Sequence, residues 1–383
     1  YLAEIEKNFV KTNAGYAGLL KKLREKVSAR QALEKSFVRV MVMQDKGKSR
    51  KTHILYKGLY NQKREEVTAE VPRSLPPLPE KAPRNRLSLA RWLVDPSHPL
   101  TARVTVNREW QKFFGTGLVK TVEDFGAQGE KPSHPQLLDW LANEFIRSGW
   151  DLKALHRLIV TSATYRQSAR WTAALAEKDP ANRLLGRGPR RRMPSWMIRD
   201  HALAISGLLV NRVGGPSVKP YQPTGVWAEA TFGKMRYRQD KGENLYRRSL
   251  YTFWRRIIGP TIFFDVAKRQ TCEVRKSLTN TPLHALATLN DTTYVEAARV
   301  LAQRVIEKGG AKAGERLRMA FRLATSRFPT AGELQILEGR LAILKKQYSQ
   351  KPDEARKLLD VGDSAPNAKL DAVEHAAYTG ICS

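Results

Sequence analysis

The stretch from Arg86 to Ser168 constrains the fold most, because its apolar residues recur at helical spacing between residues that end helices. The first apolar face ends at Asp95-Pro96, since proline lacks an amide hydrogen and clashes with the preceding turn. Three further faces follow it. The apolar residues of the successive faces are Leu89, Trp92 and Leu93; Val106, Trp110, Phe113 and Phe114; Leu137, Leu138, Leu141 and Phe145; Leu152, Leu155, Leu158 and Ile159. This pattern predicts helices packed against one another.

Glycines and polar residues mark where these helices are expected to end and begin. Gly115 and Gly117 end the second helix. Ser133 with Gln136 fits a capping box at the start of the third, and Asp151 fits the N-cap of the fourth.

β-branched runs lie outside the helical stretch. Residues 37–42 and 52–56 are two such runs, joined by the basic segment 45–51, which predicts a small hairpin or sheet near the N-terminus. One or two further short strands are expected, and the aromatic and β-branched run 250–254 is the place for one. Residues 1–35 have the composition of one or two solvated helices.

The last third of the chain carries repeated helix-start signals. Thr281 precedes Pro282 at a first helical position, and Asp291 fits the next cap. Thr330 with Glu333 fits another capping box. The fold class is therefore mainly α: a multi-helical array with a small N-terminal β element.

A proline-rich segment supplies the first domain boundary. Residues 71–83 contain five prolines and cannot form a helix or a central strand, so they are expected to be a linker. Residues 1–70 are then the end of a preceding region. Residues 84–308 form a helical core domain with an arginine and aromatic insert, and residues 311–383 form a truncated C-terminal helical segment.

The charge is strongly positive. Lysine and arginine number 67 against 37 acidic residues, a formal net charge of +30. Such a charge favours a polyanionic partner or surface: anionic polysaccharide, nucleic acid, acidic lipid headgroups or an acidic protein. The alternative is a high surface charge that an acidic neighbouring domain compensates, since charge governs encounter and solubility rather than fold.

Cysteines and histidines give no sign of a metal or haem site. Only Cys272 and Cys382 occur, so there is no disulfide framework and no haem attachment motif; Cys272 is expected to be a free buried thiol, with a bridge to Cys382 as the alternative. No two histidines have the i, i+4 spacing of helical metal ligands.

No apolar run reaches the roughly 20 residues that span a bilayer, so no transmembrane segment is expected. The chain begins within a helical pattern and without methionine, and we interpret it as a piece of a longer polypeptide.

Acidic side chains are the candidates for catalysis. Asp124 and Glu130 lie in a glycine-containing loop and could act as general acid and base or ligate Ca²⁺; the alternative is that Asp124 caps a turn and pairs with an arginine. Asp200 and Asp265 are weaker candidates of the same kind. Whether the chain is an enzyme is left open.

Arginines beside aromatic residues are the candidates for ligand binding. Guanidinium groups bind sulfate, phosphate or carboxylate in two-pronged fashion, and aromatic faces stack on sugar rings or bases. The alternative is that the rings belong to the core and the arginines pair with nearby carboxylates. The candidate residues are Arg190, Arg191, Arg192, Arg236, Arg238, Arg247, Arg248, Tyr251, Trp254 and Arg255.

Several of these stretches carry a resemblance to a known family. From about residue 40 to 305 the chain resembles a planctomycete-specific domain of unknown function, number 1553. The matching segments, besides residues 86–168, are GGPSVKPYQP at 214–223, LYRRSLYTFWRR at 245–256, CEVR at 272–275 and TNTPLHALATLND at 279–291. That family occurs at the C-terminal end of large exported proteins that often carry a cytochrome c domain upstream. The resemblance implies an extracytoplasmic location, at the periplasm or cell surface, with upstream domains as partners. It places any haem c elsewhere in the longer protein and leaves this chain without a cofactor of its own.

Charge, clustering and resemblance together predict a binding or scaffolding module for an anionic polymer, such as a sulfated or carboxylated polysaccharide. One alternative is a carbohydrate-active oxidoreductase or hydrolase domain coupled to a cytochrome c. Another is a nucleic-acid binder, which the charge alone favours.

Overall fold

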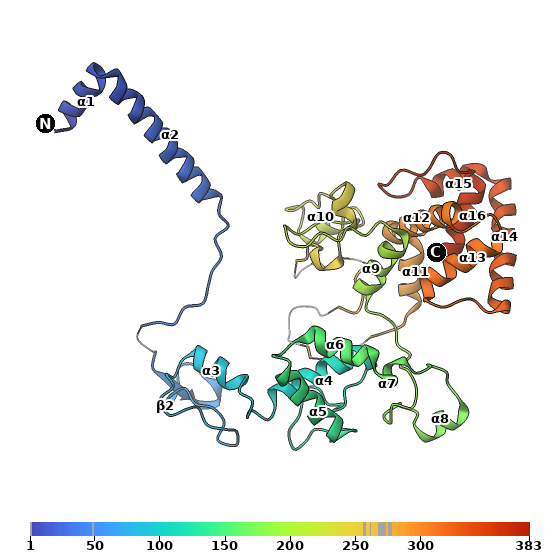
Figure 1. Ribbon diagram of the computed structural model, residues 1–383, viewed down its shortest axis with the longest axis horizontal. Coiled ribbons are helices and arrows are strands. Elements are labelled where there is room, and N and C mark those ends of the chain that lie inside the picture. Colours follow the sequence, from blue (N-terminus) through green and yellow to red (C-terminus); the bar gives the residue numbers. More distant parts are fainter. Residues whose placement is uncertain (1, 48–49, 256–257, 261, 267–272, 275–277) are drawn as a thin grey trace. The chain divides into compact units, whose positions relative to one another are not determined.

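The structure is a computed structural model of the 383-residue chain, and it describes all residues except 1, 48–49, 256–257, 261, 267–272 and 275–277. The described chain is mainly helical, as predicted, with a single two-stranded sheet in the described part (Figure 1). It divides into two compact units, residues 1–101 and 102–383. No helix among the described residues is both long and apolar enough to cross a membrane.

The N-terminal unit begins with two helices, as the sequence predicts. Helix α1 spans Leu2–Thr12 and α2 spans Ala14–Ser36, and the side chain of Asn13 caps α2. No residue of α2 is buried, because its hydrophobic residues do not gather on one face. Most of the helix is therefore solvated, and its first turns are half-buried at Tyr16, Ala17 and Leu20.

The predicted β element is only partly correct. Strand β1, Thr52–Leu55, pairs antiparallel with β2, Lys63–Val67, through the 3₁₀ turn η1, Tyr56–Gly58. The register pairs Thr52 with Val67 and Leu55 with Lys63, with one irregularity between. Residues 37–42 join no strand, so the pairing of this run with 52–56 is wrong.

The proline-rich segment lies inside the N-terminal unit. Leu78 is buried, and the indole Nε1 of Trp92 donates to the carbonyl oxygen of Pro76 at 2.7 Å. Trp92 belongs to α3, Arg86–Leu93, whose N-cap is Asn85. Pro76 thus ties the segment to α3, while the other four prolines are exposed.

The second unit opens with the predicted packed helices. They are α4 (Thr101–Phe114), α5 (Pro135–Arg147) and α6 (Leu152–Thr161). Two short helices that the sequence did not predict follow them, α7 (Ala163–Arg166) and α8 (Ala173–Lys178). The apolar faces of α4, α5 and α6 form one buried cluster that includes Val106, Leu141 and Ile159. Asp151 caps α6 by accepting from the backbone of Lys153 and Ala154, which confirms that prediction.

The capping box predicted at Ser133 is wrong. Helix α5 starts one residue later, with His134 as N-cap and Pro135 in its first turn, and no side chain bonds the cap. The backbone amide of Ser133 instead donates to the carbonyl oxygen of Leu118 at 2.9 Å. Ser133 therefore fixes the loop that precedes the helix.

The middle of the second unit is irregular. It contains α9 (Ser195–Ser206), α10 (Val226–Ala230), and the 3₁₀ turns η2 (Gly242–Tyr246) and η3 (Ser249–Tyr251). The strand predicted at 250–254 is wrong, because this run forms η3 and a single bridge from Thr252 to Val218. Its aromatic residues pack as separate rings and do not alternate across a sheet.

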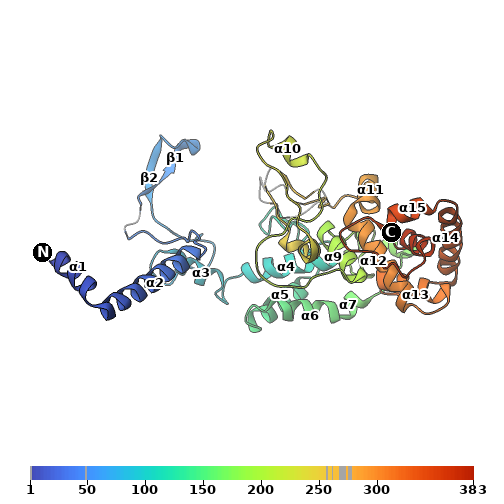
Figure 2. The same cartoon turned by 90° about the horizontal axis from the view of Figure 1, so that it is seen from above.

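The C-terminal helices form one group, which Figure 2 shows together. They are α11 (Pro282–Asn290), α12 (Thr292–Lys308), α13 (Ala313–Thr325), α14 (Ala331–Gln350), α15 (Pro352–Leu359) and α16 (Ala372–Cys382). Helix α16 packs against α12, α14 and α15 around a buried core with Leu301, Leu317 and Tyr378. The N-cap at Asp291 and the capping box of Thr330 with Glu333 are confirmed.

Candidate ligand pocket at the arginine-rich loop

The loop after α8 is built around one carboxylate. Asp179 is buried, and its two oxygens accept the backbone amides of Arg183 and Leu184, both at 2.7 Å. Asn182 has a left-handed φ of 51°, and its side chain bonds the backbone of Arg187 at both ends of its amide group. These contacts hold the loop in a fixed turn.

Two arginines of this loop serve the structure. The guanidinium of Arg183 donates to the carbonyl oxygens of Gly117 and Leu118 at 2.8 and 2.9 Å. The guanidinium of Arg187 donates to the carbonyl oxygens of Asp179 and Pro180 at 3.1 and 2.9 Å. Their donors are thus used to tie the loop to itself and to the end of α4.

The segment that receives Arg183 is itself clamped from α4. Asn107 is fully buried; its amide donates to the carbonyl oxygen of Val119 at 2.9 Å and accepts the backbone amide of Val119 at 2.8 Å. A Cβ at Gly117 would lie 2.6 Å from Asn107 Nδ2, so only glycine fits there. The loop therefore rests on a rigid base.

Between the loop and α4 lies a cavity of about 450 Å³, which we call the Trp171 pocket. That volume is within the range of small-ligand sites. Its floor is the stacked pair Trp110 and Phe114, with ring centroids 4.1 Å apart. The ring of Trp171 at its edge is 61% exposed. The lining also includes Gly115, Gly117, Arg183, Arg187, Arg190 and Arg191.

Two guanidinium groups of the Trp171 pocket are uncommitted. Arg190 and Arg191 are exposed, and neither makes a hydrogen bond or ion pair with a residue that the structure describes. Desolvation lowers the pKa of Arg191, against the opposing influence of Tyr165, but a guanidinium stays cationic at neutral pH. The pocket thus offers two free cations beside an exposed indole.

The chemistry of the lining favours binding. None of the described residues that line the pocket is aspartate, glutamate or histidine. Guanidinium forks and an aromatic face are suited to an anionic group attached to a flat or ring-shaped body. The lining supplies no carboxylate or imidazole for general acid or base catalysis.

A comparison with known families finds a match, and the matched region includes this part of the chain. A family described as PSD1, protein of unknown function (DUF1553), matches residues 85–341, two-thirds of the sequence. The chain belongs to this family. No curated protein and no solved structure matches the chain. The Trp171 pocket lies wholly inside the PSD1 region, and so do all the catalytic and ligand-binding candidates named from the sequence.

Arg192 takes no part in the pocket of this PSD1 domain. Its guanidinium pairs with the carboxylate of Asp265 and donates from Nε to the carbonyl oxygen of Thr279 at 2.8 Å. It also lies over the ring of Phe264, 4.9 Å from the centroid. Arg192 therefore fastens the start of α9 to the loop around Asp265.

Arg247 and Tyr251 are committed to each other. Arg247 is fully buried, and its guanidinium lies 3.7 Å from the centroid of the Tyr251 ring. Tyr251 is half-buried, and its hydroxyl oxygen accepts the backbone amide of Gly214 at 2.8 Å. Arg247 thus packs on a half-buried ring and makes no ion pair with a described carboxylate, so neither sequence interpretation describes this pair in full.

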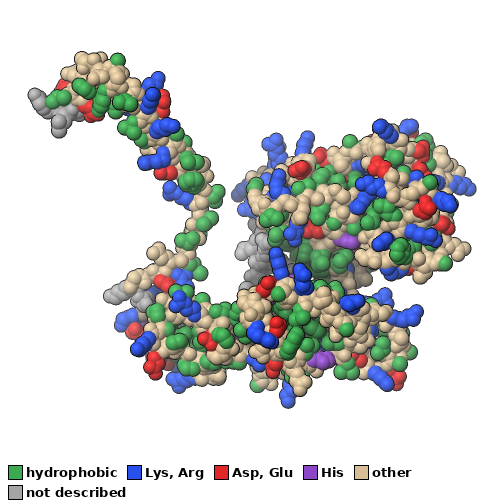
Figure 3. Space-filling model, in the orientation of Figure 1, with side chains coloured by type: hydrophobic (Ala, Val, Ile, Leu, Met, Phe, Trp, Pro, Cys, Tyr) green, Lys and Arg blue, Asp and Glu red, His purple; other side chains and the backbone are tan. Residues whose placement is uncertain are grey.

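The other candidates of this insert lie apart from the Trp171 pocket. Arg236, Arg238, Arg248 and Arg255 are exposed, and Arg255 contacts the sulfur of Met235. Trp254 is half-buried, tilted against Phe263 with centroids 5.9 Å apart. Lysine and arginine side chains are dispersed over the face of the PSD1-containing unit seen in Figure 3 and do not gather into one patch there.

The four candidate carboxylates have local partners. Asp124 accepts the amide of Gly126 at 2.7 Å, and Glu130 pairs with Lys120 at 3.2 Å. The remaining two tie segments together. Asp200 accepts the hydroxyl and amide of Ser249 at 2.6 and 2.8 Å, and Asp265 accepts the hydroxyl and amide of Thr279 at 2.7 and 2.8 Å.

Hydrogen bonds from Thr279 and the charge of Arg192 outweigh burial, and they lower the pKa of Asp265. Asp265 is thus an ionised carboxylate that joins Arg192 to Thr279. The turn at Asp124 matches the first half of the alternative reading given from the sequence.

Metal and cysteine predictions gain little from the structure. Among the described residues, no group of three or more His, Cys, Asp or Glu side chains could hold a metal ion. Cys382 packs at the edge of the α12–α16 core, and Cys272 lies outside the described residues. The choice between a free Cys272 and a bridge stays a prediction.

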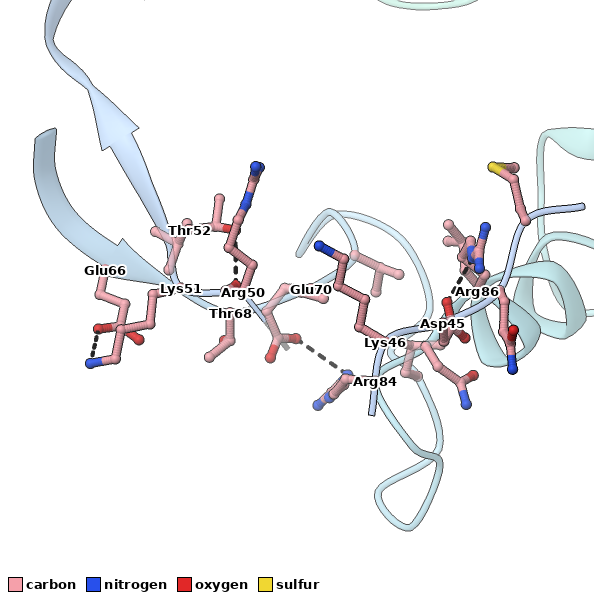
Figure 4. Close-up of a pocket in the computed structure, with 18 residues that line it drawn as sticks. Asp45, Lys46, Arg50, Lys51, Thr52, Glu66, Thr68, Glu70, Arg84 and Arg86 are labelled. Carbon is pink, nitrogen blue, oxygen red and sulfur yellow. Dashed lines mark hydrogen bonds and ion pairs between the residues drawn. The ribbon is translucent and has the colours of Figure 1, made fainter. Parts of the chain in front are cut away.

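A larger cavity, about 1030 Å³, lies in the N-terminal unit (Figure 4). Most of its charged lining is already paired. The ion pairs are Asp45 with Arg86, Lys51 with Glu66, and Arg84 with Glu70. Lys46 and Arg50 of this lining make no ion pair with the described residues, but the described lining has no aromatic ring and includes three carboxylates. It is therefore a weaker candidate than the Trp171 pocket for an anionic sugar.

Sequence reasoning missed Trp171, the residue that makes the pocket distinctive. It lies in the polar segment before α8, where no helical periodicity accounts for a large aromatic side chain. An aromatic residue without a place in any apolar face is the signal that could have revealed it.

Proposed function

We propose that this PSD1-family domain is a binding module for an anionic polysaccharide. A sulfated or carboxylated sugar would place its anionic group between Arg190 and Arg191 and its ring against Trp171. The observation that carries the proposal is the pair of uncommitted guanidinium groups beside a 61% exposed indole in one pocket. The net charge of +30 would add long-range attraction to the same polymer.

We favour binding over the hydrolase alternative because the lining residues of the Trp171 pocket include no carboxylate. A hydrolase of this kind needs a positioned acid and base beside the sugar. The coupled oxidoreductase would rest on a haem outside this chain.

An extracytoplasmic location is part of the proposal. It is supported by the resemblance of the matched segments to exported proteins with upstream domains and, in many, a cytochrome c. In that setting the domain would hold a longer polypeptide on an acidic glycan. Expression of the full-length parent followed by fractionation of the cell envelope tests this location directly.

The experiment for the ligand is a binding series at fixed salt with chondroitin sulfate, heparin, alginate, neutral dextran and duplex DNA. Arg190→Gln and Arg191→Gln should each weaken binding to one acidic glycan about tenfold or more, because a charge-assisted hydrogen bond is worth ~1.5–3 kcal/mol. Arg248→Gln is the matched control, since it removes the same charge from an exposed arginine outside the pocket.

The pattern of losses decides the matter. Equal weakening by Arg248→Gln and Arg190→Gln, with equal binding of DNA and glycans, would indicate nonspecific cation exchange and contradict the proposal. If the parent bound neutral dextran and Arg190→Gln bound it with the same affinity, the ligand would not need to be anionic. That result would contradict the anionic character of the ligand but not a sugar-binding role. Tight, sequence-dependent DNA binding would favour the nucleic-acid alternative.

A further inference from the structure

The N-terminal unit contains a strand-like segment with no neighbour. Residues 37–43, Phe-Val-Arg-Val-Met-Val-Met, follow α2 without forming a helix or strand (Figure 1). Each of its six apolar side chains is at least 61% exposed. We call residues 37–43 the open strand.

The backbone of the open strand is unpaired as well. Residues 38–43 make no backbone hydrogen bond to any residue that the structure describes. β-branched valines favour extended backbone, and the segment is drawn as an elongated trace outside any helix or strand (Figure 1). A row of free amides and carbonyls is a template for pairing with another strand.

Both faces of the open strand are apolar. Because side chains alternate, Val38, Val40 and Val42 lie on one face, and Phe37, Met41 and Met43 lie on the other with Arg39. A strand with one wet face would alternate apolar with polar residues. This composition is typical of a strand buried inside a sheet on both sides.

The neighbouring hairpin does not cover it. All but one of the residues of β1 and β2 are exposed, and an isolated two-stranded sheet is marginal in water. Met43 leads directly into the cavity of Figure 4, whose lining also includes Val67, Leu78 and Leu89. The open strand, the hairpin and this apolar lining could therefore form part of a larger sheet if a further strand were added.

We propose that the open strand is a docking surface that pairs, by strand addition, with an extended strand of a partner protein that carries an acidic residue opposite Arg39. Arg39, Lys46 and Arg50 make no ion pair with the described residues, so this end of the unit presents free positive charge. A second copy of the chain is disfavoured as the occupant, because each copy carries a net charge of +30.

The test uses the full chain and a fluorescein-labelled peptide of about nine residues, alternating valine and threonine with a central glutamate, measured by anisotropy. Val40→Pro removes one amide hydrogen from the ladder and should weaken binding about tenfold or more, equivalent to ~1.4 kcal/mol. Val40→Thr, which keeps the amide and the β-branched shape, is the matched control and should change affinity by less than about threefold. Since Val40 is exposed and unpaired, neither change should disturb the free chain.

Charge reversal and hydrogen exchange give two independent readouts. Arg39→Glu should weaken binding of the glutamate peptide and strengthen binding of the same peptide with lysine at its centre. Amide exchange should slow at residues 38–43 on peptide addition. Equal affinity of Val40→Pro and the parent, or protection that falls only elsewhere, would overturn the proposal. A dimer of the chain alone that Val40→Pro dissociates would make the occupant a second copy and would overturn it too.

Discussion

The guanidinium of Arg199 in α9 donates a hydrogen bond to the carbonyl oxygen of Arg247, 2.9 Å away, and both side chains are completely buried. The same guanidinium donates to the carbonyl oxygen of Leu245 at 2.8 Å. A buried cation normally requires hydrogen-bond acceptors or an opposite charge, and here backbone carbonyls in irregular turns supply most of the acceptors. Burial lowers the pKa of Arg199, with Asp200 acting against that shift. The irregular middle of the second unit is therefore organised by arginines rather than by a ladder.

Replacing Arg247 should lower the stability of the fold, because its side chain holds this region together and is not free to bind a ligand. Its guanidinium donates to the carbonyl oxygens of Pro216, Arg212 and Gly214 at 2.9, 3.0 and 2.5 Å. Arg247→Met removes the buried donors that hold residues 212–216; because these residues are exposed and water can reach their carbonyls, we expect a loss of ~1–3 kcal/mol in the free energy of unfolding. Urea denaturation followed by circular dichroism measures it.

Arg248 gives the matched control for that experiment. It is the next residue in the chain and is exposed. Arg248→Met should change the free energy of unfolding by less than ~0.5 kcal/mol. If Arg247→Met were as stable as Arg248→Met, the buried network would not contribute to the fold as described.

Gly362 should tolerate no side chain. It has a φ of 101°, and a Cβ there would lie 2.3 Å from Cδ of Glu296, which is itself 1% exposed. Glu296 accepts from the hydroxyl of Tyr246 and the amide of Ser364, both at 2.8 Å, so it has little freedom to move. Gly362→Ala should cost ~3 kcal/mol or more, from backbone strain and a broken buried network.

A glycine with open surroundings separates strain from a general effect of alanine. Gly332 lies near the start of α14 and has no atom within 4 Å of an added Cβ. Gly332→Ala should leave stability unchanged or raise it by up to ~1 kcal/mol, because alanine is the better helix former. Differential scanning calorimetry of both variants should give melting temperatures that shift in opposite directions or differ widely.

Stability should fall at mildly acid pH through His375. Its Nε2 lies 3.0 Å from the carbonyl oxygen of Arg299 in a buried position, and burial lowers its pKa from about 6.5. The unfolded chain therefore binds the proton first. The stabilisation is complete above pH ~6.5 and is lost as the pH falls toward the folded-state pKa, at up to ~1.4 kcal/mol per pH unit.

Urea titrations between pH ~5 and ~7.5 measure that slope, in a window above the titration of ordinary carboxylates. His375→Gln can still donate to the Arg299 carbonyl but does not titrate. The prediction concerns only the slope of stability against pH, not the baseline stability of the variant. The same slope in the variant and the parent would show that another group is responsible.

The sequence predicts helices well and irregular regions poorly, for physical reasons. Asp151 and Thr330 are read correctly because a cap needs only its own side chain and the next few amides. The run 250–254 is misread because its aromatic density is used for separate ring contacts, such as Phe253 with Trp227 at 5.7 Å. Those contacts join residues far apart in the chain, which local propensity cannot register.

The candidate site shows the same limit. Arg190 and Arg191 are found from their charge, but the same charge also selects Arg247, which is fully buried. An arginine that binds a ligand and one that holds backbone carbonyls look alike in sequence, since both need the same donors. Only the partners of each guanidinium distinguish them.

Trp171 supplies the last prediction, because its exposed ring lies at the edge of the pocket that holds Arg190 and Arg191. Stacking of a nucleic-acid base on an aromatic side chain is worth ~1–3 kcal/mol, and we expect a loss at the lower end of that range for a sugar ring. Trp171→Ala should therefore weaken glycan binding about tenfold, while Trp171→Phe keeps a ring and should weaken it less. The chain has 8 tryptophans. The fluorescence change on binding must therefore be taken as the difference between the parent and Trp171→Phe. A glycan-induced change that survives intact in Trp171→Phe, with undiminished affinity in Trp171→Ala, would place the ligand elsewhere on the domain.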